Sequence, residues 1–161
     1  MPFVYTVGLP ANVASLTTCG TTNTEYAGLA MRQATRGFDL QAVYAHGMAN
    51  AATSISGIGF RVRRWTTAGS GGTSITPAPK RIGTTAQTTA ASNSGGAITV
   101  GTVDGSTQVA FGCGGSGPGG WVAPDLDSRV HVEGGSSDEL LVYTIATPTS
   151  MPFGVATEIV E

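Results

Sequence analysis

Short segments of alternating polar and apolar residues, separated by glycine-rich turns, are the feature that most restricts the fold of this chain. Segments 3–9, 58–65, 139–146 and 153–161 each carry this period-two alternation, which places successive side chains on opposite faces of a β-strand. About eight to ten such segments, spaced by roughly 10–15 residues, predict an all-β fold, a single β-sandwich with a jelly-roll-like arrangement.

Segment 38–46, FDLQAVYAH, illustrates the pattern. Its alternation predicts one strand face made of Phe38, Leu40, Ala42 and Tyr44. The neighbouring segment 25–35, EYAGLAMRQAT, fits either a short helix or a strand. Its internal glycine and threonine-rich flank favour a strand.

The composition agrees with one β-domain. The chain has 161 residues, of which 40% are hydrophobic, 11% are charged and 24 are glycine, and a chain of this length supports one core. We expect residues 1–36 to form an N-terminal arm or the first strands, and residues 37–161 to form the sandwich core. Within the core, the Gly-, Thr-, Pro- and Ala-rich stretch 68–97 predicts a long extended loop that leaves the core.

The stretch 112–121, GCGGSGPGGW, contains a formal G-x-G-x-x-G between Gly115 and Gly120. A nucleotide-binding loop of this kind needs a following helix, whose N–H groups bind the phosphates. The next residues, WVAP, are extended and end in a proline, so we expect a turn. Cys113 is expected to end the preceding strand as a small buried residue. Cys19 and Cys113 could form a disulfide, but two buried thiols suit a reducing cytosol better.

No constellation predicts metal binding or catalysis. Two His and two Cys show no paired ligand spacing. Asp125 and Asp127 could hold Ca²⁺, or could simply be turn acids before a strand. Glycoside cleavage by scattered carboxylates is a weaker alternative. We therefore expect no catalytic residue, no cofactor, no metal and no enzymatic activity.

The densest charge in the chain is the run Arg61-Val62-Arg63-Arg64, followed by Trp65. The alternation places Arg61, Arg63 and Trp65 on one strand face, where they could grip an acidic partner or form a solvated face. We place the predicted partner interface on Arg61, Arg63, Trp65 and Trp121. Arg64 falls on the apolar side, which predicts a bulge or a buried pair with a carboxylate.

The formal net charge of −2 gives no field that would recruit nucleic acid or an anionic membrane. No apolar run approaches the roughly 20 residues of a membrane-spanning helix. The N-terminus lacks a basic region followed by an apolar one, so we expect synthesis in a host cytoplasm without a secretory signal.

Two stretches resemble small structural proteins of tailed bacteriophages, the head decoration or capsid cement proteins. These are FRVRRWTTAGSGGTSITPAPKR at 60–81 and GGWVAPDLDSRVHVEGGSSDELLVYTIAT at 119–147. The resemblance covers roughly residues 38–161 and consists of an arginine-rich strand, a Thr-Pro segment, a Trp-Val-Ala-Pro strand and a strand after a Gly-Gly-Ser turn. The stretch after Lys80 is richer in Ala and Thr than the common pattern.

The resemblance implies a non-enzymatic virion protein on the capsid exterior, bound to the major capsid protein, often as a homotrimer, with no nucleic-acid or membrane partner. An alternative function is a receptor- or glycan-binding module of a fibre or tail. For that alternative, Trp65, Trp121 and Tyr44 would stack on sugar faces, whereas the simpler interpretation makes them core or subunit-interface aromatics.

Overall fold

The computed structural model describes residues 2–8, 18–19, 25–32, 36–47, 58–67, 69–92, 98–99, 101–102, 108–113, 118–134, 138–144 and 153–161. Their strands are β1 (Val4–Gly8), β2 (Thr18–Cys19), β3 (Glu25–Arg32), β4 (Phe38–Gly47), β5 (Ile58–Trp65), β6 (Ser70–Gly71), β7 (Thr73–Ile75), β8 (Ala78–Pro79), β9 (Thr89–Ser92), β10 (Ile98–Thr99), β11 (Val109–Cys113), β12 (Pro118–Val122), β13 (Val130–Val132), β14 (Glu139–Thr144) and β15 (Phe153–Val160).

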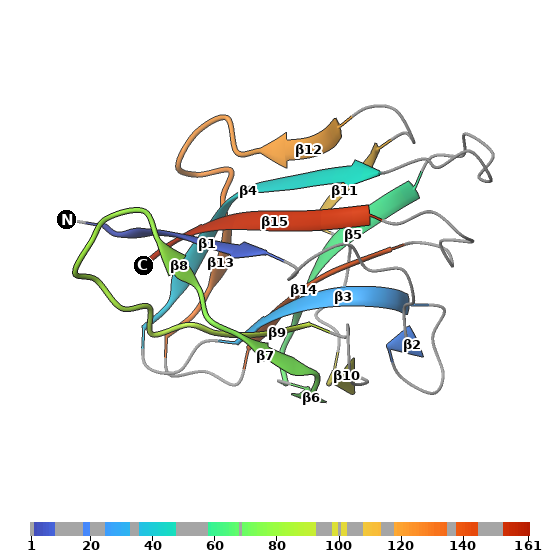
Figure 1. Cartoon of the computed structure of the whole chain (residues 1–161), viewed down its shortest axis with the longest axis horizontal. Coiled ribbons are helices and arrows are strands. Elements are labelled where there is room, and N and C mark those ends of the chain that lie inside the picture. Colours follow the sequence, from blue (N-terminus) through green and yellow to red (C-terminus); the bar gives the residue numbers. More distant parts are fainter. Residues whose placement is uncertain are drawn as a thin grey trace.

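Two antiparallel sheets pack face to face as a β-sandwich (Figure 1). Sheet A has the order β12-β4-β15-β1-β8, and β13 also pairs with β4. Sheet B has the order β11-β5-β14-β3-β9-β7, and β2 also pairs with β3. The small pair β6–β10 forms a third, two-stranded sheet. The predicted all-β sandwich is confirmed, and 25–32 is the strand that we favoured over a helix.

The pairing of the strands is nested. β4 pairs with β12 and β15 in sheet A, while the next strand, β5, pairs with β11 and β14 in sheet B. The chain therefore folds as an antiparallel ribbon that alternates between the two sheets, as jelly-roll proteins do. The first strand pairs with the last, and the N–H of Phe3 donates to Glu161 O at 2.9 Å. Both ends of the chain consequently lie together at one end of the sandwich (Figure 1).

The core lies between the two sheets and takes residues from both. Its buried members are Tyr5, Val7, Met31, Phe38, Leu40, Val43, Ala45, Phe60, Val62, Ala90, Val109, Cys113, Val132, Leu140, Val142, Val155 and Ile159. Phe60 stacks on Phe111 of the neighbouring strand, with ring centroids 5.3 Å apart. Burial of this apolar surface is the main source of stability for a chain that carries few charges.

The predicted inward face of β4 is wrong beyond Leu40. Leu40 pairs with Ile159, whereas Ala42 pairs with Glu158, so the register shifts across Gln41. This β-bulge adds one residue to β4 and reverses the alternation after it. Val43 and Ala45 consequently enter the core, while Tyr44 is 45% exposed.

The stretch 68–97 is less separate from the core than we expected. β8 extends sheet A beside β1, while β9 and β7 extend sheet B beside β3. Ala90 is part of the core, and Thr88 and Ser92 are buried. Short backbone ladders hold β6, β7, β8 and β9, and the part that projects in Figure 1 is the turn that follows β8.

The glycine-rich stretch is a turn only in part, because Pro118–Val122 is strand β12 and Gly112–Cys113 ends β11. β11 is an edge of sheet B and β12 an edge of sheet A, so the stretch joins the two sheets. A Cβ on Gly119 would overlap the carbonyl oxygen of Gly112, and glycine allows this close approach. Cys113 is a buried thiol, as predicted; the side chain of Cys19 and residues 114–117 lie outside the described residues.

Within the described part of the chain, no helix is long and apolar enough to cross a membrane.

Candidate interaction surfaces

The arginine run of β5 lies on the outer face of sheet B. Phe60 and Val62 point into the core and Arg61 is exposed, as the alternation predicts. Trp65 is only 3% exposed, and the guanidinium carbon of Arg63 lies 5.7 Å from the centre of its ring. This cation–π contact covers one side of the indole. Arg61 is therefore the member of the run that a partner could reach most readily.

Trp121 does not join the β5 residues. It pairs with Val43 at the edge of sheet A and packs, half-buried, against the core. The predicted interface residues Arg61, Arg63 and Trp65 thus lie together, and Trp121 lies on another sheet. Trp65 is buried and Trp121 packs half-buried against the core, as the simpler interpretation expects, whereas Tyr44, the third of these aromatics, is 45% exposed.

Arg64 is neither at a bulge nor fully buried. The register of β5 with β14 runs without a shift through Arg64 and Leu140. The N–H of Arg64 donates to Gln108 Oε1 at 2.8 Å, and its guanidinium donates to the carbonyl of His131 at 3.4 Å. The side chain therefore extends away from the apolar face to the other sheet, where its guanidinium binds a carbonyl of β13.

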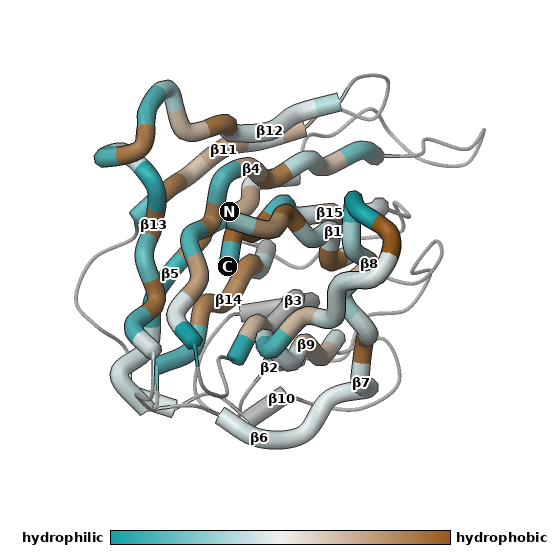
Figure 2. Tube along the Cα trace, turned by 90° about the vertical axis from the view of Figure 1, so that its left-hand side faces the viewer, coloured by the Kyte–Doolittle hydropathy of each residue, from teal (hydrophilic) through white to brown (hydrophobic). Residues whose placement is uncertain are grey.

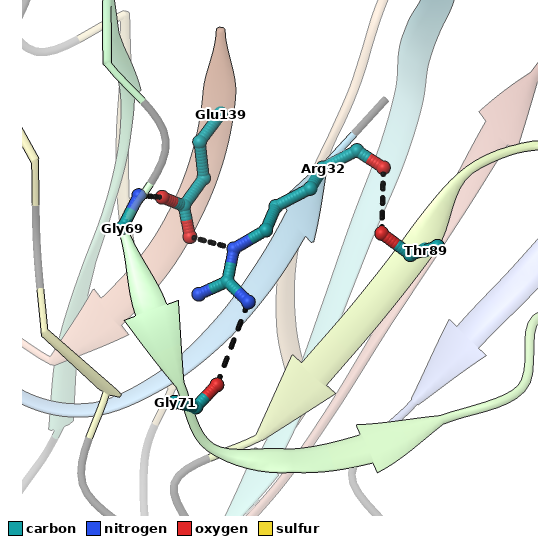
Figure 3. A network of polar contacts seen from close by, with 5 residues as sticks. All are labelled: Arg32, Gly69, Gly71, Thr89 and Glu139. Carbon is teal, nitrogen blue, oxygen red and sulfur yellow. Dashed lines mark hydrogen bonds and ion pairs between the residues drawn. The ribbon is translucent and has the colours of Figure 1, made fainter. Parts of the chain in front are cut away.

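A polar network centred on the buried Glu139, the cross-strand neighbour of Trp65, lies on sheet B (Figure 3). Glu139 Oε1 accepts from Arg32 Nε at 3.1 Å, and Glu139 Oε2 accepts from the N–H of Gly69. Arg32 Nη1 also donates to the carbonyl of Gly71 at 3.4 Å, and Thr89 donates to the carbonyl of Arg32 at 3.2 Å. The network ties the segment around β6 to strands β3, β9 and β14.

Burial raises the pKa of Glu139, and the Gly69 N–H and the Arg32 guanidinium oppose this shift only in part. The residue Glu139 is only 1% exposed to solvent. Desolvation of the charged form thus outweighs the favourable contacts that the carboxylate makes. Because of this balance, we assign Glu139 a structural role in positioning the Gly69–Gly71 segment.

The turn Lys80–Gly83, after β8, carries a fully exposed isoleucine, Ile82. Gly83 has a φ of +87°, which the turn requires and which side chains rarely adopt. Lys80 is held by its N–H to the carbonyl of Val4 at 3.0 Å and by an ion pair with Glu158. Thr84 closes the turn by donating to the carbonyl of Arg81 at 3.0 Å. Ile82 is thus presented by a fixed turn, directly after the basic residues Lys80 and Arg81.

A second turn presents Leu126, which is 71% exposed between two aspartates. Asp125 Oδ1 accepts from the N–H of Ser128 at 2.8 Å and from its hydroxyl at 2.6 Å. These bonds lower the pKa of Asp125, and they make it the turn acid of our simpler interpretation. We call the Lys80–Gly83 and Asp125–Ser128 segments the basic tip and the acidic tip.

The two tips project from the same end of the sandwich. Figure 1 shows the loop between β12 and β13 at the upper left, above β4, and the turn after β8 reaching further left, beside β1. In Figure 2, which faces this end, hydrophilic and hydrophobic segments adjoin at each of them. Sequence reasoning missed these tips, although an isolated Ile or Leu among turn-forming charged residues was a usable signal.

His131 forms a small ionic cluster between β13 and β4. Its Nδ1 lies 2.6 Å from Asp39 Oδ1, and its Nε2 lies 3.3 Å from Glu133 Oε2. The hydrogen bond with Asp39 is the main reason why the pKa of His131 is raised. Among the described residues, no group of three or more His, Cys, Asp or Glu is arranged to hold a metal ion.

A cavity of about 610 Å³ opens at the end of the sandwich where the chain termini meet. It is lined by Phe3, Tyr5, Arg36, Gly83, Thr84, Thr85, Gln87 and Glu161. The Glu161 carboxylate accepts from the N–H of Gln87 at 2.9 Å and from the N–H of Thr88 at 2.7 Å. The backbone pairing of Phe3 with Glu161 and these hydrogen bonds hold the Glu161 carboxylate in the lining of the cavity.

Comparison with known proteins gave no match to a family, to a curated protein or to a solved structure.

Proposed function

We propose that this chain is a non-enzymatic structural protein of a phage virion, which binds the outer surface of the capsid and stabilises it. The proposal rests on the sequence resemblance over residues 38–161 and on one structural observation. Two bulky apolar side chains, Ile82 after β8 and Leu126 between β12 and β13, are exposed on hydrogen-bonded turns. If a partner covers these two side chains, their burial contributes free energy with little ordering cost, because each stands on a hydrogen-bonded turn.

The charges beside the tips support contact between copies as well as contact with the capsid. The basic tip carries Lys80 and Arg81, and the acidic tip carries Asp125 and Asp127. A heterologous contact between the basic tip of one copy and the acidic tip of the next would close a ring if the rotation allows it. A homotrimer, seated on the major capsid protein at the capsid exterior, is the assembly that we propose.

The experiment adds purified protein to preformed capsids that lack it and measures bound copies by sedimentation. Ile82→Ser and Leu126→Ser should each weaken attachment by about tenfold or more, because burying one such side chain contributes about 1.5–3 kcal/mol. Tyr44→Ser is the matched control, since Tyr44 is exposed on sheet A rather than at a tip, and it should retain wild-type occupancy.

Two results would overturn the proposal. One is the absence of this chain from purified virions in a mass-spectrometric inventory. The other is wild-type capsid occupancy for both tip variants, together with a monomer in sedimentation velocity. Loss of binding at high salt would additionally indicate that the charges of the tips take part in the contact.

A further inference from the structure

The cavity at the terminal end of the sandwich has the lining of a ligand site rather than of a packing defect. Its volume of about 610 Å³ falls in the range of small-molecule pockets. Phe3 lies directly opposite the backbone of Glu161, and Tyr5 is two residues further along β1. Strand periodicity therefore places both aromatic rings on the same side of β1, facing the interior.

The polar groups of the cavity are fixed and varied. Glu161 is held by the N–H groups of Gln87 and Thr88, so its remaining lone pairs point in a set direction. Thr84 donates its hydroxyl proton to the carbonyl of Arg81 and keeps its acceptor capacity. Arg36, just before β4, supplies guanidinium donors to the lining.

The charges of the lining select against an ionic ligand. Arg36 and Glu161 are the charged side chains of the lining among the described residues, and they have opposite signs. The other polar side chains, those of Thr84, Thr85 and Gln87, are neutral hydroxyl or amide groups. Paired donors and acceptors over an aromatic wall suit a hydroxyl-rich, uncharged ligand with one apolar face.

From this arrangement we infer that the cavity is a binding site for a neutral saccharide. Hydroxyl groups of the sugar bind Glu161 and Arg36, and its C–H face packs on Phe3. This function is additional to capsid attachment, because the site uses none of the exposed side chains at the two tips. It also differs from the sugar-stacking aromatics considered from the sequence, since none of Trp65, Trp121 and Tyr44 lines the cavity.

The test is an array of neutral and acidic oligosaccharides, followed by NMR titration of ¹⁵N-labelled protein with the neutral sugars that bind. The amide signals of Gln87 and Thr88 should shift, because their N–H groups share the Glu161 carboxylate with the ligand. Arg36→Gln should weaken binding by about tenfold, the effect of losing one charged hydrogen bond. Arg81→Gln makes the same change of charge outside the cavity and should leave the affinity unchanged.

Three results would overturn the inference: no binding to neutral saccharides, binding to acidic glycans alone, or equal affinity of wild type and Arg36→Gln. Free amino acids serve as zwitterionic competitors, and their binding in place of sugars would count against it equally. The Ile82→Ser variant should bind the sugar normally, so failure of the saccharide site and failure of capsid attachment are distinguishable.

Discussion

Glu139 shows how one side chain can organise the outer face of a sheet. It is the first residue of β14, and its cross-strand neighbours are Trp65 and Arg32. Its carboxylate connects the Arg32 guanidinium to the backbone of Gly69. A buried ion pair of this kind adds little net stability, since desolvation offsets the attraction, but the loss of one partner leaves the others unsatisfied.

Two substitutions at Glu139 separate the loss of a hydrogen-bond acceptor from the removal of the buried charge. Glu139→Ala should destabilise the protein by about 2–3 kcal/mol, because Arg32 and the Gly69 N–H lose their acceptor. Glu139→Gln should cost less than Glu139→Ala, since the amide oxygen still accepts from one of the two donors and the desolvated charge is gone. Urea unfolding at neutral pH measures both values.

The difference in unfolding free energy between wild type and Glu139→Gln depends on pH. A raised pKa means that the folded state favours the protonated acid, so this contribution is complete below the usual Glu pKa and is lost as the pH rises through the raised value. Glu139→Gln removes it. Equal destabilisation by the Ala and Gln variants would contradict the role given to the carboxylate.

At the scale of elements, the glycine-rich stretch closes one side of the sandwich. β11 and β12 are the edges of different sheets, and they approach backbone to backbone at Gly112 and Gly119. The approach protects two edges that would otherwise offer unpaired groups to other strands. Gly119, which lies within the glycine-rich stretch but is not one of the fixed glycines of its formal G-x-G-x-x-G, is thus required for packing between the sheets.

Gly119→Ala should destabilise the protein by about 3 kcal/mol, because the new methyl group would meet a carbonyl oxygen that the β5–β11 ladder holds in place. Gly8→Ala is the control, since a Cβ there would lie 3.6 Å from Ala156 Cβ, an ordinary contact. Thermal unfolding followed by circular dichroism compares the two. A Gly119→Ala protein as stable as Gly8→Ala would refute the close approach.

At the scale of the whole molecule, the last strand holds sheet A together. β15 pairs with β4 on one side and with β1 on the other, and it contributes Val155 and Ile159 to the core. These pairings join residues from opposite ends of the chain, so the loop entropy of the intervening chain must be overcome before sheet A can form.

A chain that ends before Phe153 should therefore lose cooperative unfolding and near-ultraviolet circular dichroism, because β1 and β4 would lack their shared neighbour. A chain without Glu161 alone keeps the β15 ladder and serves as the control, with a folded core expected. A cooperative thermal transition in the shorter chain would contradict the central position of β15.

The sequence alone predicted the fold class and the strands whose alternation is regular. The inward positions of β1 and β5 follow directly from period two, because one face of each strand is buried. The β4 prediction failed beyond Leu40, since a bulge depends on what the partner strand β15 offers. Of the four predicted interface residues, three share the outer face of sheet B, and their role with a partner stays a prediction.

What the sequence determined by itself was local: strand periodicity, turn chemistry and the glycines that permit unusual backbone geometry. Only the tertiary structure decided which edges meet, which arginine stays exposed and which residues surround the terminal cavity. Phe3, Arg36, Gln87 and Glu161 are far apart in the sequence and carry no shared motif. They come together because β1 pairs with β15 across the whole chain, and such long-range pairing is set by the sum of many contacts rather than by local pattern.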